Sequence, residues 1–134
     1  EDTLGRLSDR IDPERDSGLD YYPLPGVGER FPINDPALAP RLEPRPTDDV
    51  RFLHGLFDGM ARIEALGYAR LAALGAPPIR SVRSVGGGAR NRVWTRLRER
   101  ALDVPFAPAA STEAAVGVAR LALGGLHRSR APGP

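Results

Sequence analysis

A run of three glycines is the clearest candidate for chemistry in this chain. Gly86, Gly87 and Gly88 precede Ala89 and Asn91, between a β-branched segment and a predicted helix. Backbone N–H groups are exposed at such a turn, where the dipole of the following helix is positive, and the missing Cβ atoms let a flat or charged ligand approach. An adenine ring, a ribose or a phosphate would suit it. Asn91 could cap the helix or direct its amide at the ligand.

A plain structural turn explains the same residues. Three consecutive glycines do not match the G-x-G-x-x-G pattern of dinucleotide sites, and many tight turns contain glycine pairs. From the residues alone, nucleotide binding and a simple connection between strand and helix both stay open.

The composition excludes several other chemistries. All 19 cationic side chains are arginine, and the 134 residues contain neither lysine nor cysteine. A lysine Schiff base, a phosphate loop of the G-x-x-x-x-G-K-[ST] type, thiolate catalysis and cysteine-ligated zinc are therefore excluded for this chain. The two histidines, His54 and His127, are far apart in sequence and do not suggest a metal site. We interpret His54 as a packed or surface residue.

The charge pattern does not favour nucleic acid or a membrane as a partner. The net charge is only +2, and the densest basic run, residues 90–100, contains a single aromatic residue, Trp94. Nucleic-acid-binding surfaces usually combine clustered basic residues with several aromatics, so this run is better explained as the solvated face of a helix. No stretch approaches the ~20 apolar residues that span a bilayer.

The glycine turn needs elements on both sides to hold it. Residues 79–85 predict a short β-branched strand, and residues 92–102 predict a helix. Residues 104–106 predict a second extended piece. A last helix, which ends at a glycine pair, is expected to end near the turn, because short connections keep successive elements adjacent. The residues concerned are Ser111, Thr112 and Glu113 at its start and Gly124 and Gly125 at its end.

Residues 47–75 predict one long helix, with Thr47 as its N-cap and Gly75 as the left-handed residue that follows it. Three glycines lie inside it, namely Gly55, Gly59 and Gly67. Each costs about 1 kcal/mol relative to alanine, so we expect a neighbouring element to pack closely against them. We interpret Asp58, on the same helix, as structural.

The rest of the chain divides by composition. Residues 1–46 are rich in proline and predict a mostly irregular, extended segment, whose aromatic residues indicate that it packs on the domain. The domain itself is expected over residues 47–125, and a flexible tail over residues 126–134. Because the chain begins with Glu1 instead of methionine, we expect it to be part of a longer protein.

Several motifs in collinear order resemble one family, the FGGY carbohydrate kinases, in their C-terminal domain. The resemblance covers about residues 18–125, and its motifs are Gly28–Pro32, the helix segment Leu53–Ala61, the turn segment Val85–Trp94, Val104-Pro105 and Thr112–Gly117. The segments Asp20–Leu24 and Gly28–Ile33 look closest to the pentulose kinase branch, especially D-ribulose and xylulose kinase-like members.

The resemblance implies a fold and a nucleotide site. FGGY kinases have two ribonuclease-H-like domains of the actin, hexokinase and Hsp70 type, with sugar and Mg-ATP bound between them. This chain would then be an α/β, partial ribonuclease-H-like domain of about three helices and a few short strands. The family's adenosine-binding Gly-Gly-Gly-Ala-x-x-Asn turn is matched by Gly86, Gly87, Gly88, Ala89 and, with one fewer intervening residue, Asn91.

The chemistry that the resemblance implies is transfer of the γ-phosphoryl group of ATP to a sugar hydroxyl, with an aspartate as base and Mg²⁺ neutralising phosphate charge. In the family, the base and the phosphate loops lie upstream of the part matched here, so no catalytic residue and no metal ligand is assigned. We expect a cytoplasmic protein, and we expect this chain alone to lack kinase activity. It would self-associate or pack against the missing part.

Two other hypotheses stay open. The chain could be a stand-alone nucleotide-binding or protein-interaction module without catalysis. It could also be a remnant in which the glycine turn only joins a strand to a helix.

Overall fold

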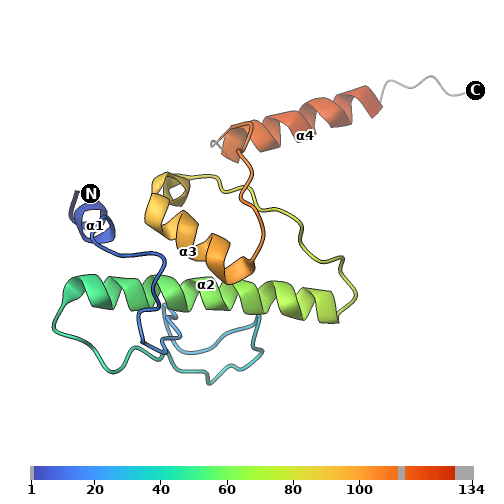
Figure 1. Cartoon of the computed structure of the whole chain (residues 1–134). Coiled ribbons are helices and arrows are strands. Elements are labelled where there is room, and N and C mark those ends of the chain that lie inside the picture. The colour runs from blue at the N-terminus through green and yellow to red at the C-terminus, as the bar shows by residue number, and fades with distance from the viewer. Residues whose placement is uncertain (1, 112–113, 129–134) are drawn as a thin grey trace, which may run out of the picture.

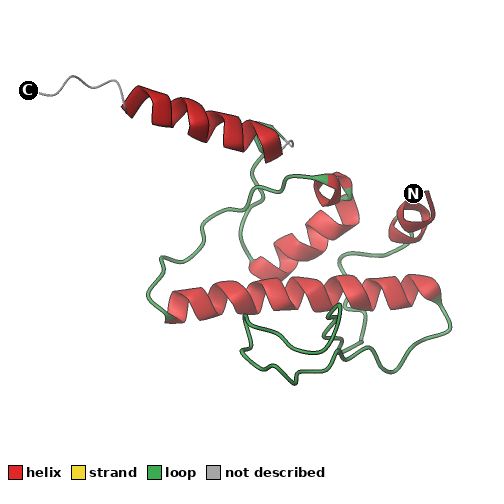
Figure 2. Cartoon of the chain, turned by 180° about the vertical axis from the view of Figure 1, so that it is seen from behind, coloured by secondary structure: helices red, strands yellow, loops and turns green. Residues whose placement is uncertain are grey.

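The computed structural model describes residues 2–111 and 114–128 and is built around one long helix. Its helices are α1 (Asp2–Ser8), α2 (Asp49–Ala73), the short 3₁₀ helix η1 (Gly87–Arg90), α3 (Arg92–Leu102) and α4 (Ala114–Arg128). α3 lies on one side of α2, and the irregular segment before α2 covers the other side (Figure 1). The view from behind shows the same two-sided arrangement, with α4 beyond α3 (Figure 2).

α2 confirms the prediction of a long helix, but the helix begins one residue later than predicted. The N-cap is Asp48, not Thr47, because the Asp48 carboxylate accepts a hydrogen bond from the Val50 N–H at 3.0 Å. Asp49 then opens the first turn, where the helix dipole favours negative charge. At the other end, Gly75 adopts φ +95°, the left-handed conformation expected of it.

The close approach expected at the helix glycines is confirmed. A Cβ atom on Gly55 would lie 2.7 Å from Leu19 Cδ1 and 2.9 Å from the Tyr21 ring. On Gly59 it would lie 2.8 Å from both the Tyr21 carbonyl oxygen and Pro23 Cδ. Residues 19–23 therefore lie directly on α2, through their side chains and the Tyr21 carbonyl. Tyr21, only 1% exposed, is the most deeply buried aromatic residue among those described.

The segment before α2 is irregular, as predicted, but it also contains a helix that the sequence did not indicate. Two isolated antiparallel bridges, Tyr22 with Arg41 and Glu29 with Asp35, fold residues 20–41 into a compact loop. The unpredicted helix, α1, has only seven residues, too few for a hydrophobic repeat to be recognised. It ends at Ser8, which is 2% exposed.

A small core lies where α1, α2 and α3 meet. The Phe57 and Trp94 rings pack with centroids 5.4 Å apart, and Leu97 is 1% exposed. The other members are Leu7, Ile11, Val50, Leu53 and Val93. Burial of these side chains is the main force that holds α3 against α2.

The strands predicted at 79–85 and 104–106 are reduced to one contact. Val82 and Phe106 form an isolated parallel bridge, in which the Val82 N–H donates to the Pro105 carbonyl and the Ala107 N–H donates to the Val82 carbonyl. Pro105 and Pro108 have no N–H to extend this pairing. The described residues are thus helical and irregular, with three isolated bridges in place of the few strands expected.

α4 begins at Ala114 and continues through the glycine pair at which it was predicted to end, as far as Arg128. A glycine inside a helix costs only about 1 kcal/mol, which is not enough to terminate one. Residues 126–128 of the predicted tail therefore belong to α4, and residues 129–134 lie outside the described residues, as do Thr112 and Glu113. Three apolar side chains of α4 are exposed: Val118, Leu121 and Leu123.

Alanine substitutions at two helix glycines should distinguish the steric cost of an added Cβ atom from the gain in helix propensity that alanine brings. Gly59→Ala should lower the free energy of unfolding by about 1–3 kcal/mol, because its Cβ would meet a backbone carbonyl that cannot move. At Gly67 the only close atom is Phe31 Cε1, at 3.3 Å, on a ring that is 47% exposed and can shift. Gly67→Ala should therefore be neutral or stabilising. Urea denaturation of both variants tests this, and equal stabilisation by both would contradict it.

Candidate functional site

The glycine turn is a tight turn that only glycine can begin. Gly86 has φ +80° and ψ −170°, a backbone conformation that side chains rarely allow. The Ala89 N–H then donates to the Gly86 carbonyl at 3.2 Å, and the Asn91 N–H donates to the Gly88 carbonyl at 3.1 Å. These bonds form η1 and deliver the chain into α3.

The outer face of the turn is open. A Cβ atom added to Gly86 or Gly87 would meet no atom within 4 Å, and one on Gly88 would lie 3.6 Å from the Trp94 ring, an ordinary contact. Gly87 also has no left-handed φ. Neither internal packing nor backbone conformation explains a glycine at position 87. The space in front of it is free for another molecule.

Asn91 caps α3, which is one of the two roles that the sequence left open for it. Its side-chain oxygen accepts a hydrogen bond from the Trp94 N–H at 2.9 Å, which caps α3. Its side-chain NH₂ donates to the hydroxyl of buried Ser8 at 2.7 Å. Both ends of the amide are thus used inside the protein. Asn91 orients the turn and ties it to the end of α1.

A pocket of about 550 Å³ lies beside the turn, between the residues that precede it and α4. Its apolar wall includes Val85, next to Gly86 in the chain, and Val116 of α4. Ser111 and Val116 line the same pocket, so it is the beginning of α4 that lies beside the segment leading into the turn. The sequence had predicted the end of this helix there. Arg83 and Arg120 also line it, and the structure gives neither guanidinium an ion-pair partner among the described residues. The sequence did not single out these two arginines.

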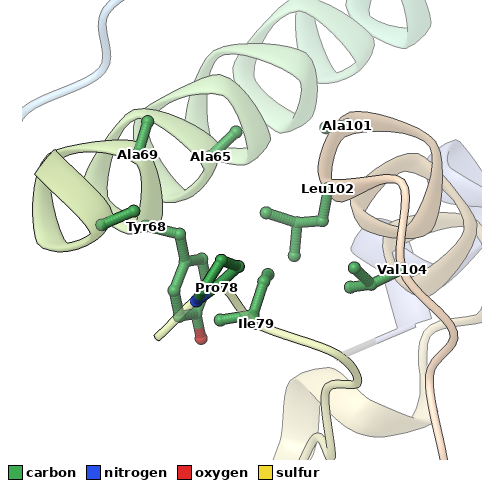
Figure 3. A pocket seen from close by; sticks show the side chains of 9 residues that line it. Ala65, Tyr68, Ala69, Pro78, Ile79, Ala101, Leu102 and Val104 are labelled. Atoms are coloured by element: carbon green, nitrogen blue, oxygen red, sulfur yellow. The ribbon is translucent and has the colours of Figure 1, made fainter. Parts of the chain in front are cut away.

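A second, smaller pocket of about 270 Å³ lies between the C-terminal halves of α2 and α3 (Figure 3). Ala65, Ala69, Pro78, Ile79 and Leu102 contribute to its wall, and Tyr68 is its one side chain with a polar group. Without a charged lining residue, it offers little to a phosphorylated ligand.

Arg98 holds the segment before the turn, a role that the sequence did not indicate. The basic run was interpreted as a solvated face, which describes Arg96, with half of its side chain exposed, but not Arg98 at 14%. Arg98 donates to both carboxylate oxygens of Glu64 on α2, at 2.6 and 2.7 Å, and to the Ser84 hydroxyl at 2.6 Å. The hydrogen bond with Glu64 raises the pKa of Arg98 above its ordinary value.

A cluster of charged residues around Asp58 is structural, as the sequence indicated. The Asp58 carboxylate is 5% exposed and accepts a hydrogen bond from the Ser17 N–H at 2.8 Å. His54 Nε2 lies 3.5 Å from it and Arg100 Nη2 lies 3.6 Å from it. Arg100 also donates to the carbonyl oxygens of Pro13 and Arg15. The carboxylate thus joins the irregular segment, α2 and α3, and it is closed to substrate.

The Gly28-Glu29-Arg30 segment also has a structural contact. Glu29 accepts a hydrogen bond from the Tyr22 hydroxyl across the compact loop. Burial, together with this hydrogen bond, raises the pKa of Tyr22 to about 12. The carboxylate thus holds the loop closed.

Neither a metal centre nor a membrane span occurs in the part of the chain that the structure describes. No three metal-binding side chains come together there, and none of its helices combines the length and apolar content that crossing a bilayer requires.

Comparison with known protein families identifies the family of this chain. Residues 6–125 match the C-terminal domain of the FGGY family of carbohydrate kinases. The match covers most of the chain, so the chain belongs to this family. Its members are carbohydrate kinases that generally use ATP and Mg²⁺, and their C-terminal domain is ribonuclease-H-like.

The Asp58 cluster predicts a large stability effect. Asp58→Ala should lower the free energy of unfolding by about 3–5 kcal/mol, because it leaves the buried Ser17 N–H without its acceptor and removes the buried carboxylate beside His54 and Arg100. Asp20→Ala is the matched control: its ion pair with Arg41 is exposed and should contribute at most about 1 kcal/mol. Thermal and urea unfolding measure both effects. A cost for Asp58→Ala no larger than that of the control would show that the cluster does not hold the segments together.

Proposed function

We propose that this chain supplies the adenosine-binding part of an ATP-dependent sugar kinase. One observation carries the proposal: Gly87 is open to the outside, with neither packing nor a left-handed φ to explain it, beside a pocket of nucleotide-compatible size. Gly86, Gly87, Gly88 and Ala89 would present backbone to the nucleotide, and Asn91 would hold the turn in place through its contacts with Trp94 and Ser8.

The pocket beside the turn supports this assignment by its chemistry. An apolar wall that includes Val85 and Val116 suits a planar base, and the guanidinium groups of Arg83 and Arg120 suit its π face or an anionic group. Backbone recognition needs no lysine, so a lysine-free chain is compatible with ATP binding.

The bond-making step belongs to the whole kinase. ATP supplies a γ-phosphoryl group that passes to a sugar hydroxyl, and this chain's own residues would only bind and orient the adenosine end. Asp58 is closed to substrate, and no metal-ligand cluster lies among the described residues, so we assign the base and the Mg²⁺ ligands to other parts of the kinase. We propose a pentulose as the sugar, from the Asp20–Leu24 and Gly28–Ile33 motifs, and the cytoplasm as the location.

Substitution of Gly87 tests the adenosine site. Gly87→Val should leave the melting temperature nearly unchanged, because a Cβ atom there would meet no atom within 4 Å, and should weaken ADP binding at least about tenfold by blocking close approach. Gly26→Val is the control, since Gly26 is a loop glycine with equally open surroundings. Titration of ADP, followed by Trp94 fluorescence and by calorimetry, gives the affinities. Unchanged ADP binding in Gly87→Val would refute the proposed role of the turn.

The chain alone should be inactive as a kinase. Incubation of the 134-residue chain with Mg-ATP and D-ribulose or D-xylulose should release ADP no faster than the buffer does, because Asp58 is closed to substrate and the catalytic base of the family lies upstream of the matched residues. A coupled ADP-release assay measures this. Phosphorylation of either sugar would show that the catalytic group lies within these residues.

An interaction module is the second candidate. The exposed apolar residues Val118, Leu121 and Leu123 of α4 favour it, because an uncovered apolar face tends to associate with another surface. Such a module would bind ADP equally well as the wild type and as the Gly87→Val variant, or it would not bind ADP at all.

A further inference from the structure

Arg98 has an unusual position in this fold, because its side chain touches three separate segments. It extends from α3, makes a two-pronged ion pair with Glu64 on α2, and donates its remaining Nη1 to Ser84. Ser84 lies two residues before Gly86, in the segment that leads into the turn. The guanidinium plane thereby connects the long helix to the entry of the turn.

The same guanidinium also contacts the exit of the turn. It lies over the Trp94 ring, 5.3 Å from the ring centroid, and over the Phe106 ring, at 4.8 Å. Trp94 is the nearest side chain to Gly88, since a Cβ there would lie 3.6 Å from its ring. Arg98 is therefore linked to the turn before Gly86, through Ser84, and after Gly88, through Trp94.

Arg96, two residues earlier on α3, provides a comparison for the contacts of Arg98. Arg96 makes a comparable two-pronged pair with Glu14, at 2.5 and 3.0 Å, but half of its side chain is exposed and it contacts neither the turn nor α2. Arg98 is 14% exposed, and each of its three side-chain nitrogens donates a hydrogen bond. A lysine could not make these three bonds in the same geometry.

We infer that Arg98 is a positioning residue for the nucleotide turn, which fixes the distance and orientation of residues 84–91 relative to α2. This inference rests on the proposed function only where it concerns nucleotide affinity. Its structural part, the ordering of the turn by Arg98 and Ser84, can be measured without any ligand.

Ser84 provides the sharper test, because its substitution leaves the Arg98–Glu64 pair intact. In Ser84→Ala, the amide protons of Ala89 and Asn91, both hydrogen-bonded within the turn, should exchange about tenfold faster, as expected for loss of a hydrogen bond to a charged group. Amides of α2 should exchange as in the wild type. Ser84→Thr keeps the hydroxyl and should restore the protection. Ser81→Ala, at an exposed position in the same segment, should change nothing.

Arg98→Gln, compared with Arg96→Gln, extends the test to the nucleotide. Arg98→Gln should speed exchange at Ala89 and Asn91 more than Ser84→Ala does and should weaken ADP binding about tenfold or more. Arg96→Gln should leave both unchanged. Wild-type exchange rates in Ser84→Ala and in folded Arg98→Gln would overturn the inference. If the wild type binds no ADP, the proposed function fails, and the exchange rates still decide the role of Arg98.

Discussion

The direct contact between residues 19–23 and α2 is the constraint on which the other features of this structure depend. It exists because Gly55 and Gly59 carry no Cβ, so that Tyr21 and Pro23 can lie on the helix surface. α2 is thereby covered on one side by irregular chain and on the other by α3. A helix enclosed in this way can support residues from both sides at fixed positions.

Charged side chains hold together segments of the fold that lie outside the small apolar core. The core of eight apolar residues is modest for a chain of this length, and it lies toward one end of α2. Asp58 and Glu64, both on α2, bind segments that the core does not reach, and each accepts from an arginine of α3 or lies beside one. Because such pairs are directional, they set orientation more than they add stability. The glycine turn directly precedes α3, the helix that these pairs orient.

Sequence reasoning succeeded where the signal was local. The three glycines inside a long helix predicted that another segment packs closely on that helix. Gly75 predicted a left-handed residue directly after the helix. Both predictions rest on residues that are close together in the sequence. The contacts of Arg98 with Glu64 and of Asp58 with Ser17 could not be predicted in the same way. They join residues 34 and 41 positions apart, and nothing in the composition distinguishes Arg98 from the exposed Arg96. The predicted strands failed because a β-branched run forms a strand only when partners extend its pairing.

The hydrogen bond between Asn91 and Ser8 has a consequence for the order of folding. It joins residues 83 positions apart, and the Arg96–Glu14 and Arg100–Pro13 contacts span similar separations. Closing such long loops is slow compared with forming a helix. During synthesis, the start of the chain therefore emerges long before its partners and must wait for α3. The glycine turn takes its final form only when Asn91 meets Ser8.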